Sequence, residues 1–184
     1  MKKIEIIENF LDKDDLITLS NLKLDSVPND SLKVYHNEID KEDKVRKSCI
    51  DTKIIKSLHA KYHKKAFELL KSISPKKAEL YEYSDFSIVR TGKNYKFPIH
   101  DDTPNKLLSG VIYLYPEKNT GTIFYSNKKG DDKNIVGWKQ NRGVFFARVE
   151  QETWHSFEGD GQSDRVVLVY NLATTQIKKV FKIE

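Results

Sequence analysis

The second half of this chain, from Pro75 onward, consists of short runs rich in Val, Ile, Tyr and Phe, separated by clusters of Gly, Asn, Asp and Pro. This pattern is typical of the strands of a β-sandwich or barrel, and no other feature restricts the possible folds as strongly. The predicted strands are 80–90, 95–100, 107–115, 121–125, 143–146 and 165–172, with 180–183 as a further candidate. We therefore expect a mainly β core.

The residues before Pro75 follow a different periodicity. Between 51 and 73 the apolar side chains recur every three or four residues, which predicts an amphipathic helix that Pro75 ends. A strand is expected over 4–7, and a helix is expected around the leucines that follow it: Leu16, Leu19, Leu22 and Leu24. The polar segment 27–47 contains turn residues and is expected to wrap the surface.

Helices first and strands afterwards indicate a mainly β chain of the α+β type. The predicted architecture is a double-stranded β-helix, or jelly roll, with the helices packed on one outer face. A single domain is expected over 1–184, with helical support in 1–75 and the jelly-roll core in 76–184.

Composition excludes several classes of protein. Cys49 is the only cysteine, so the chain forms no internal disulfide and no cysteine zinc cluster, which fits a reducing, cytoplasmic compartment. An uninterrupted apolar run of about 18 residues is missing, so membrane spanning is not expected. The net charge is +5, but the 32 basic residues are interleaved with 27 acidic ones. Nucleic-acid binding is therefore possible but not favoured.

Two potential metal ligands, His100 and Asp102, stand two residues apart at the end of a predicted strand and so project from the same face. A later histidine, His155, could complete a set of two histidines and one carboxylate, which leaves metal positions open as non-haem iron(II) oxygenases need. The triplet alone is weak evidence, because a turn with solvated acids has the same sequence. Asp101 would replace Asp102 if the strand register slipped by one residue.

Arg165 adds weight to this set. It lies ten residues beyond His155 (165 minus 155), at the start of an apolar strand. An arginine in such a strand must find an anion or point outward, because a buried unpaired guanidinium is costly. Its fork of donors matches a carboxylate.

Several short motifs now stand in a definite order. They are Thr91-Gly92, His100-Asp101-Asp102, Gly110-Val111-Ile112-Tyr113-Leu114, Gly121-Thr122, Asn141-Arg142-Gly143-Val144-Phe145-Phe146, Trp154-His155-Ser156, and Arg165 with its apolar strand. In these motifs the chain resembles the 2-oxoglutarate/iron(II) oxygenase superfamily, and within it the prolyl-4-hydroxylase-like branch, over 86–172.

The resemblance implies His100, Asp102 and His155 as iron ligands and Arg165 as the partner of the distal carboxylate of 2-oxoglutarate. Tyr113 falls where many members place a tyrosine that bonds the same carboxylate. An ordinary core or surface aromatic is the other interpretation of Tyr113, and Tyr115, expected on the same face, is the alternative residue.

The chain departs from the family pattern at two places. Gly121-Thr122 stands where related enzymes commonly have Gly-Gly. Arg90 occupies a place where prolyl-hydroxylase-like members often carry a tyrosine. Arg90 could pair with a carboxylate of substrate or cosubstrate, or it could face solvent. This departure weakens the case for a peptidyl-proline substrate.

The expected function is that of an Fe(II)/2-oxoglutarate-dependent dioxygenase, which uses O2 to hydroxylate a protein, peptide or small molecule and releases succinate and CO2. Asp102 argues against a halogenase, because halide-binding members lack that ligand. The alternatives are a nucleic-acid-modifying oxygenase and a non-catalytic cupin-like binding module, which would have no need for Arg165. The remaining histidines, His36, His59 and His63, are expected to be solvated.

Overall fold

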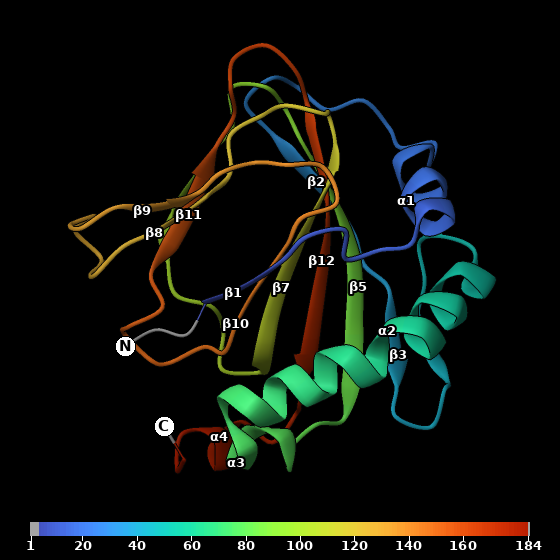
Figure 1. Ribbon diagram of the computed structural model, residues 1–184, viewed down its shortest axis with the longest axis vertical. Helices are drawn as coiled ribbons and strands as arrows, with labels where there is room; N and C mark the ends of the chain where they lie inside the picture. Colours follow the sequence, from blue (N-terminus) through green and yellow to red (C-terminus); the bar gives the residue numbers. More distant parts are fainter. Residues whose placement is uncertain (1–3, 184) are drawn as a thin grey trace.

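The computed structural model describes residues 4–183 and contains two antiparallel sheets that face each other, with the longer helices on one outer face (Figure 1). The strands of the larger sheet are, in spatial order, β1 (Ile4–Ile7), β10 (Gly143–Phe146), β7 (Lys106–Tyr115), β12 (Arg165–Ala173), β5 (Tyr83–Thr91), β3 (Glu38–Asp40) and β4 (Val45–Lys47), with β2 (Leu32–Tyr35) also paired to β5. The smaller sheet has the order β6 (Lys96–His100), β11 (His155–Glu158), β8 (Thr122–Phe124) and β9 (Asn134–Val136).

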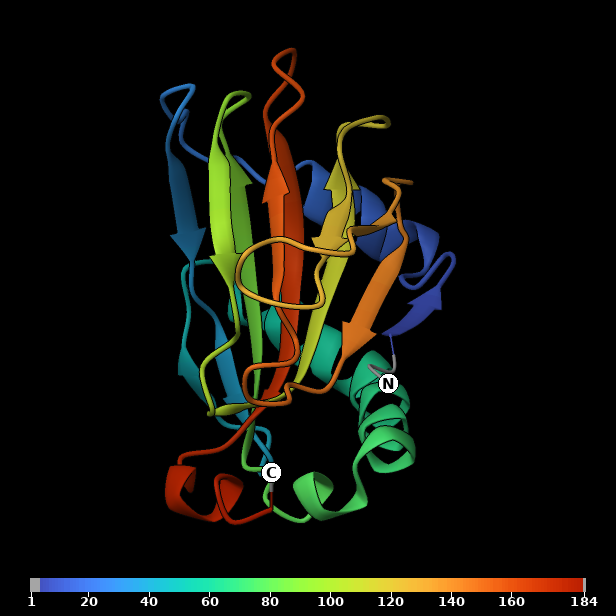
Figure 2. The same cartoon turned by 90° about the vertical axis from the view of Figure 1, so that its left-hand side faces the viewer.

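The longest helix, α2 (Thr52–Ile73), begins where the Asp51 side chain accepts a hydrogen bond from the Lys53 amide. It ends at Ser74, and Pro75 opens the short helix α3 (Pro75–Ala78). The other helices are α1 (Lys13–Ser20) and α4 (Ile177–Val180). Figure 2 shows α1 and α2 behind the strands, with α3 and α4 below them. None of the helices in the described range is both long and apolar enough to cross a membrane.

Strand β12 explains how one sheet serves two purposes. Its even-numbered residues, such as Leu168 and Tyr170, belong to the buried cluster that also holds α2 residues. Its odd-numbered residues include Arg165 and Val167, which face the space between the two sheets. The period-2 alternation of a strand therefore gives one face to the helices and the other to a cavity.

The mainly β class and the helix predicted over 51–73 are confirmed, and the strands at 4–7 and 143–146 have the predicted bounds. Two predictions are wrong. The N-terminal part is not helical support alone, because 27–47 contributes β2, β3 and β4. These strands have only three or four residues, and each includes charged residues (LKVY, EID and VRK), so their apolar signal is weak. The candidate strand at 180–183 is also wrong, since Val180 ends helix α4.

Candidate metal centre and adjoining cavity

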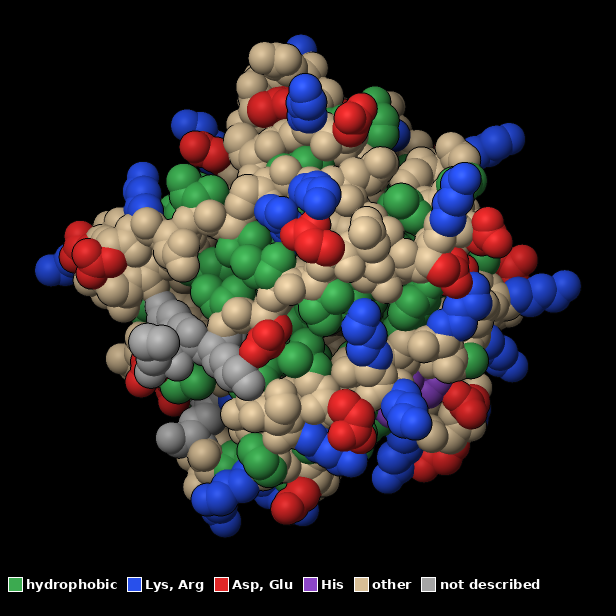
Figure 3. Space-filling view, viewed as in Figure 1, with side chains coloured by type: hydrophobic (Ala, Val, Ile, Leu, Met, Phe, Trp, Pro, Cys, Tyr) green, Lys and Arg blue, Asp and Glu red, His purple; other side chains and the backbone are tan. Residues whose placement is uncertain are grey.

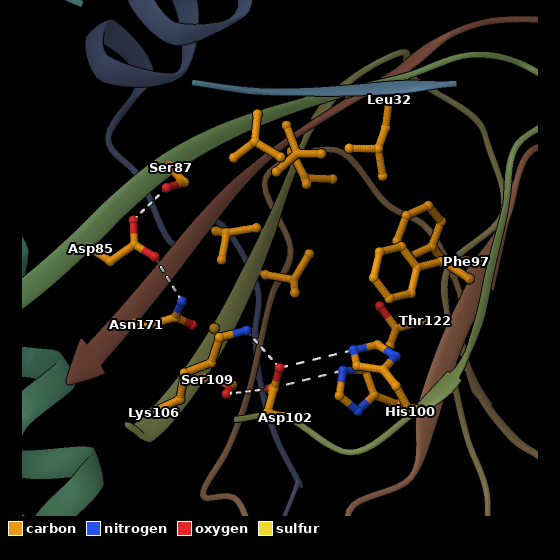
Figure 4. Close-up of a pocket in the computed structure, with 18 of the residues that line it drawn as sticks. Leu32, Asp85, Ser87, Phe97, His100, Asp102, Lys106, Ser109, Thr122 and Asn171 are labelled. Carbon is orange, nitrogen blue, oxygen red and sulfur yellow. Dashed lines mark hydrogen bonds and ion pairs between the residues drawn. The ribbon is translucent and has the colours of Figure 1, made fainter. Parts of the chain in front are cut away.

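Three potential ligands meet where the smaller sheet faces the larger one. His100 ends β6, and its Cα partner across the ladder is His155, the first residue of β11. The His100 and His155 rings lie next to each other, with 4.1 Å between their centroids, and Asp102 faces His100 (Figure 4). The distances are 3.9 Å from Asp102 Oδ1 to His100 Nε2 and 3.9 Å from Asp102 Oδ2 to His155 Nε2. One ligand atom from each residue lies within 4.8 Å of the others. Among residues 4–183 this is the only such group of three.

The backbone fixes the orientation of both imidazoles. His100 Nδ1 lies 3.0 Å from the Pro98 carbonyl, and His155 Nδ1 lies 2.8 Å from the Thr153 carbonyl. Because a carbonyl only accepts, Nδ1 donates in both rings, and in the neutral form of each ring the lone pair is on Nε2. Both lone pairs are therefore available to a metal, in the arrangement that metal-binding histidines usually show.

The side chains of Asp102 and Asp101 have different partners, and these show which of the two carboxylates lies beside the histidines. Asp102 accepts hydrogen bonds from Lys106 Nζ and Ser109 Oγ, each at 2.6 Å. Asp101 turns the other way and accepts from Thr153 Oγ1 at 2.6 Å. Asp102 is therefore the carboxylate that shares a face with the histidines. Lys106 and Ser109, which the sequence analysis missed, hold it in place.

The electrostatics of the site favour ligands in their metal-binding forms. Burial alone would raise the pKa of Asp102, but Lys106 and His155, together with the Ser109 hydrogen bond, lower it to about 2. Burial lowers the pKa of His155 to about 4, against the opposing effect of the Asp102 charge. At neutral pH the site therefore holds an ionised carboxylate and a neutral imidazole, as metal binding requires.

Acid should destabilise the metal-free protein because of His155. Between its ordinary pKa of 6.5 and about 4, the unfolded chain binds a proton that the folded chain does not. Stability should therefore fall as the pH falls, by about 2 kcal/mol from pH 7 to pH 5. Asp102, with a folded pKa of about 2, contributes only below this window. Urea unfolding of chelator-treated protein at the two pH values measures the loss.

The variant His155→Gln is the control for this prediction. Burial also lowers the pKa of His63, which adds a loss of the same sign that both proteins share. The difference between parent and variant therefore isolates His155. An equal loss of stability in the two proteins would contradict the prediction.

A cavity of about 290 Å³ extends from the triad between the two sheets. Arg165 lines it and is 2% exposed, and neither Nε nor Nη1 has a hydrogen-bond partner. The guanidinium carbon lies 3.9 Å from the ring centroid of Phe157 and 5.3 Å from that of Trp138. Burial lowers the pKa of Arg165 to about 10. A buried cation with partnerless donors leaves the cavity incomplete without an anion.

Tyr113 lies behind the cavity wall. Its side chain is fully buried and stacks on Trp138 with 4.4 Å between ring centroids. Its hydroxyl lies 2.9 Å from Thr122 Oγ1 and accepts a hydrogen bond from the Thr122 amide. Thr122 lines the cavity, whereas Tyr113 does not. The sequence analysis noted Thr122 only as a departure from Gly-Gly and missed it as a cavity residue.

Arg90 and Tyr115 lie on the other face of the larger sheet, where they line a separate cavity. Arg90 donates to the Asp164 carboxylate, with 2.8 Å from Nη2 to Oδ2. The ladder between β12 and β7 shifts register, so that Val167 opposes Tyr113 and Val166 opposes Tyr115. This irregularity turns Tyr115 away from the face of Tyr113. The expectation that the two tyrosines share a face is therefore wrong.

The solvated helix face expected for His59 and His63 is also wrong. His59 is 5% exposed, and its Nδ1 lies 2.8 Å from Asp43 Oδ1. The Nδ1 atom of His63 is buried, and its ring packs against Tyr81 in a tilted arrangement, with 4.9 Å between ring centroids. Both side chains belong to the packing between α2 and the larger sheet.

The chain was compared with family models, curated proteins and solved structures, and only the solved structures gave matches. Neither a family model nor a curated protein matches the sequence. The structure is similar to a 2OG-Fe(II) oxygenase family oxidoreductase from Burkholderia pseudomallei (TM-score 0.65, 16% identity, 92% of this chain and 84% of that one). It is also similar to a Pseudomonas putida prolyl-4-hydroxylase (TM-score 0.63, 13% identity, 95% and 94%).

A third similar structure is a prolyl hydroxylase from Trichoplax adhaerens in complex with a hypoxia inducible factor peptide (TM-score 0.63, 14% identity, 96% of this chain and 86% of that one). At these identities the likeness is one of fold. The chain has the fold of the 2-oxoglutarate/iron(II) oxygenases, including prolyl hydroxylases, over most of its length. The resemblance seen in the sequence motifs is confirmed at this level.

Proposed function

We propose that this protein is an Fe(II)/2-oxoglutarate-dependent dioxygenase that hydroxylates a protein, peptide or small-molecule substrate and releases succinate and CO2. One observation carries the proposal: the cavity that holds the two-histidine, one-carboxylate cluster also holds the partnerless Arg165 guanidinium. Arg165 contacts Phe157, which is two residues beyond His155 on β11. Arg165 and the triad therefore line the same cavity, in which one dicarboxylate would meet both the metal and the guanidinium.

Each residue has a defined task in this proposal. His100, Asp102 and His155 hold iron(II) on one face and leave its other positions open. Arg165 grips the distal carboxylate of 2-oxoglutarate and thereby orients it. When bound, the iron supplies the oxidising chemistry with 2-oxoglutarate and O2. The apolar residues of the cavity wall, such as Val167 and Phe146, exclude water from the site.

The finer structural expectations belong to the same proposal. The two facing sheets and the outer helices support a double-stranded β-helix in a single domain. The free, exposed Cys49 agrees with a reducing, cytoplasmic location.

The two alternative functions have less support. Figure 3 shows acidic and basic side chains interleaved over the face drawn, which does not favour a nucleic-acid surface there. A cupin-like binding module would give no reason for the buried, partnerless donors of Arg165.

The proposal is tested by 2-oxoglutarate turnover. Purified protein with Fe(II) and 2-oxoglutarate should form succinate, and a chelator should abolish its formation. Separate pools of peptides, small molecules and nucleic acids should be added, because the class that stimulates turnover identifies the substrate. If the Mn(II)-loaded protein does not bind 2-oxoglutarate and no pool yields succinate, the proposal is wrong.

Replacing Tyr113 by Phe should raise the 2-oxoglutarate requirement only modestly. The change removes the hydroxyl that bonds Thr122, while Arg165 still holds the carboxylate. This bond lies within the protein, contributes about 0.5–1.5 kcal/mol and affects the cavity only through Thr122, so the loss of 2-oxoglutarate affinity should be at most about tenfold. Calorimetric titration of 2-oxoglutarate into the Mn(II)-loaded variant measures it. Tyr115→Phe is the matched control and should bind as the parent does, since Tyr115 lies on the other face.

A further inference from the structure

The cavity has a second polar cluster, on the wall across from His100 and Phe97 (Figure 4). Asp85 on β5 lies opposite Asn171 on β12 in the ladder. Asn171 Nδ2 donates to Asp85 Oδ2 at 3.0 Å, and Ser87 Oγ donates to Asp85 Oδ1. All three side chains line the same cavity as the metal triad. The metal chemistry described above uses none of them.

The atoms that this cluster offers to a ligand are acceptors. Asn171 is 2% exposed, yet its Oδ1 has no hydrogen-bond partner. The amide nitrogen of Asn171 donates to Asp85, and this orients the side chain so that its Oδ1 atom is the acceptor left for a ligand. The Asp85 carboxylate adds two more acceptor oxygens. A buried carbonyl left without a donor costs free energy, so the cluster is incomplete as it stands.

The charge of the cluster is also unbalanced. Within residues 4–183 Asp85 makes no ion pair, and burial raises the pKa of its carboxyl group. Lys106, whose charge lowers the pKa of Asp85, is bound instead to Asp102, with 2.6 Å from Nζ to Oδ1. His36 lies at the exposed end of the cluster, with its Nδ1 3.2 Å from Ser87 Oγ. A cationic ligand would supply the missing charge.

The walls beside this cluster are aliphatic. They include Leu32 and Val34 of β2, Val89 of β5, and Val169 of β12. A ligand that fits both features has a cationic head and an aliphatic stem. An ammonium group has three donors, which equals the number of acceptor oxygens that Asp85 and Asn171 provide together.

We propose that Asp85 and Asn171 bind a protonated amino group of the substrate, so that the substrate is an aliphatic amine, either a small molecule or the lysine side chain of a peptide. This inference rests on the proposed function, because the metal triad in the same cavity must act on the bound amine.

The test is calorimetric binding to the protein loaded with Mn(II) and 2-oxoglutarate. Two pairs of probes separate the possible sources: pentylamine against pentanol, and acetyl-Ala-Lys-Ala-amide against the same peptide acetylated on the lysine. The charged probe of at least one pair should bind about tenfold or more tightly than its neutral match, as expected of a charge-assisted hydrogen bond. If the protein prefers pentylamine to pentanol, the substrate is a small-molecule amine. If it prefers the unmodified peptide to the acetylated one, the substrate is the lysine side chain of a peptide.

Asp85→Asn should remove most of this preference, because it keeps the shape of the side chain and removes the charge. Asp25→Asn is the matched control: Asp25 is exposed, pairs with Lys33 and does not line the cavity. That variant should bind the probes as the parent does. The comparison of charged and neutral probes on the unchanged protein does not depend on any variant folding.

Equal binding of charged and neutral probes, or an undiminished preference in Asp85→Asn, would overturn the inference. Equal binding is also expected if metal loading releases Lys106 onto Asp85, because the carboxylate is then neutralised from within the chain. Titration with Mn(II) and 2-oxoglutarate before the amine probes are added distinguishes failure of the substrate inference from failure of the proposed function. If both bind but no amine is preferred, only the inference about the substrate fails.

Discussion

Replacing His155 by Ala should abolish tight binding of Fe(II) or Mn(II), and with it 2-oxoglutarate turnover. His155 is 8% exposed, and its Nε2 points toward Asp102 from the first position of β11. Loss of residues that only support metal ligands commonly costs 10- to 100-fold in affinity, so loss of a ligand should cost at least about 100-fold. Titration with Mn(II), followed by its paramagnetic resonance signal, measures the effect.

The matched control for this prediction is His36→Ala. His36 also lines the cavity, but it lies by Ser87 and outside the triad. Its removal should leave Mn(II) affinity unchanged. Undiminished metal binding in the His155 variant would rule out the triad, and loss in both variants would mean that the metal lies elsewhere in the cavity.

Replacing Arg165 by Lys should weaken 2-oxoglutarate much more than it weakens the metal. The change puts a point charge where a planar fork now lies between Phe157 and Trp138. Truncating one partner of a buried charge pair costs about 2–5 kcal/mol, and a lysine that keeps the charge should lose about ten- to 100-fold in 2-oxoglutarate affinity. Separate titrations of Mn(II) and 2-oxoglutarate distinguish the two effects.

Arg90→Lys provides the comparison on the opposite face of the same sheet. Arg90 is satisfied by Asp164 and by the Leu24 carbonyl, so this change should leave 2-oxoglutarate affinity as it is in the parent. An equal loss of metal and 2-oxoglutarate in the Arg165 variant would indicate that Arg165 only supports the sheet.

Some features of the site follow from local sequence. The period of a strand predicts that His100 and Asp102 share a face. In the structure β6 ends at His100, and the residues that follow still bring Asp102 beside His100 and His155. Arg165 stands out because a guanidinium at the head of an apolar strand must find an anion or point outward, and in the structure its Nε and Nη1 atoms are buried without partners. The helix over 51–73 is long enough for its 3.6-residue period to be plain.

Other features depend on pairing between distant segments. Tyr115 leaves the face of Tyr113 because the ladder with β12 shifts register, which no local period reveals. Thr122 becomes a cavity residue only when β8 lies in the facing sheet. Such shifts arise from the packing of whole strands against one another.

The sequence by itself determined the mainly β class, the long helix, the potential ligands His100, Asp102 and His155, and the need of Arg165 for an anion. The class, the helix and the shared face of His100 and Asp102 follow from periods of two or 3.6 residues, and the cost of burying a charge requires Arg165 to find an anion or point outward. His155 joins the set through the resemblance to the oxygenase superfamily. Only the tertiary structure decided which side chains meet across strands. Asp85 and Asn171, 86 residues apart, become partners because β5 and β12 are adjacent. Strand order and register depend on the burial of the entire sheet, so no short segment of sequence encodes them.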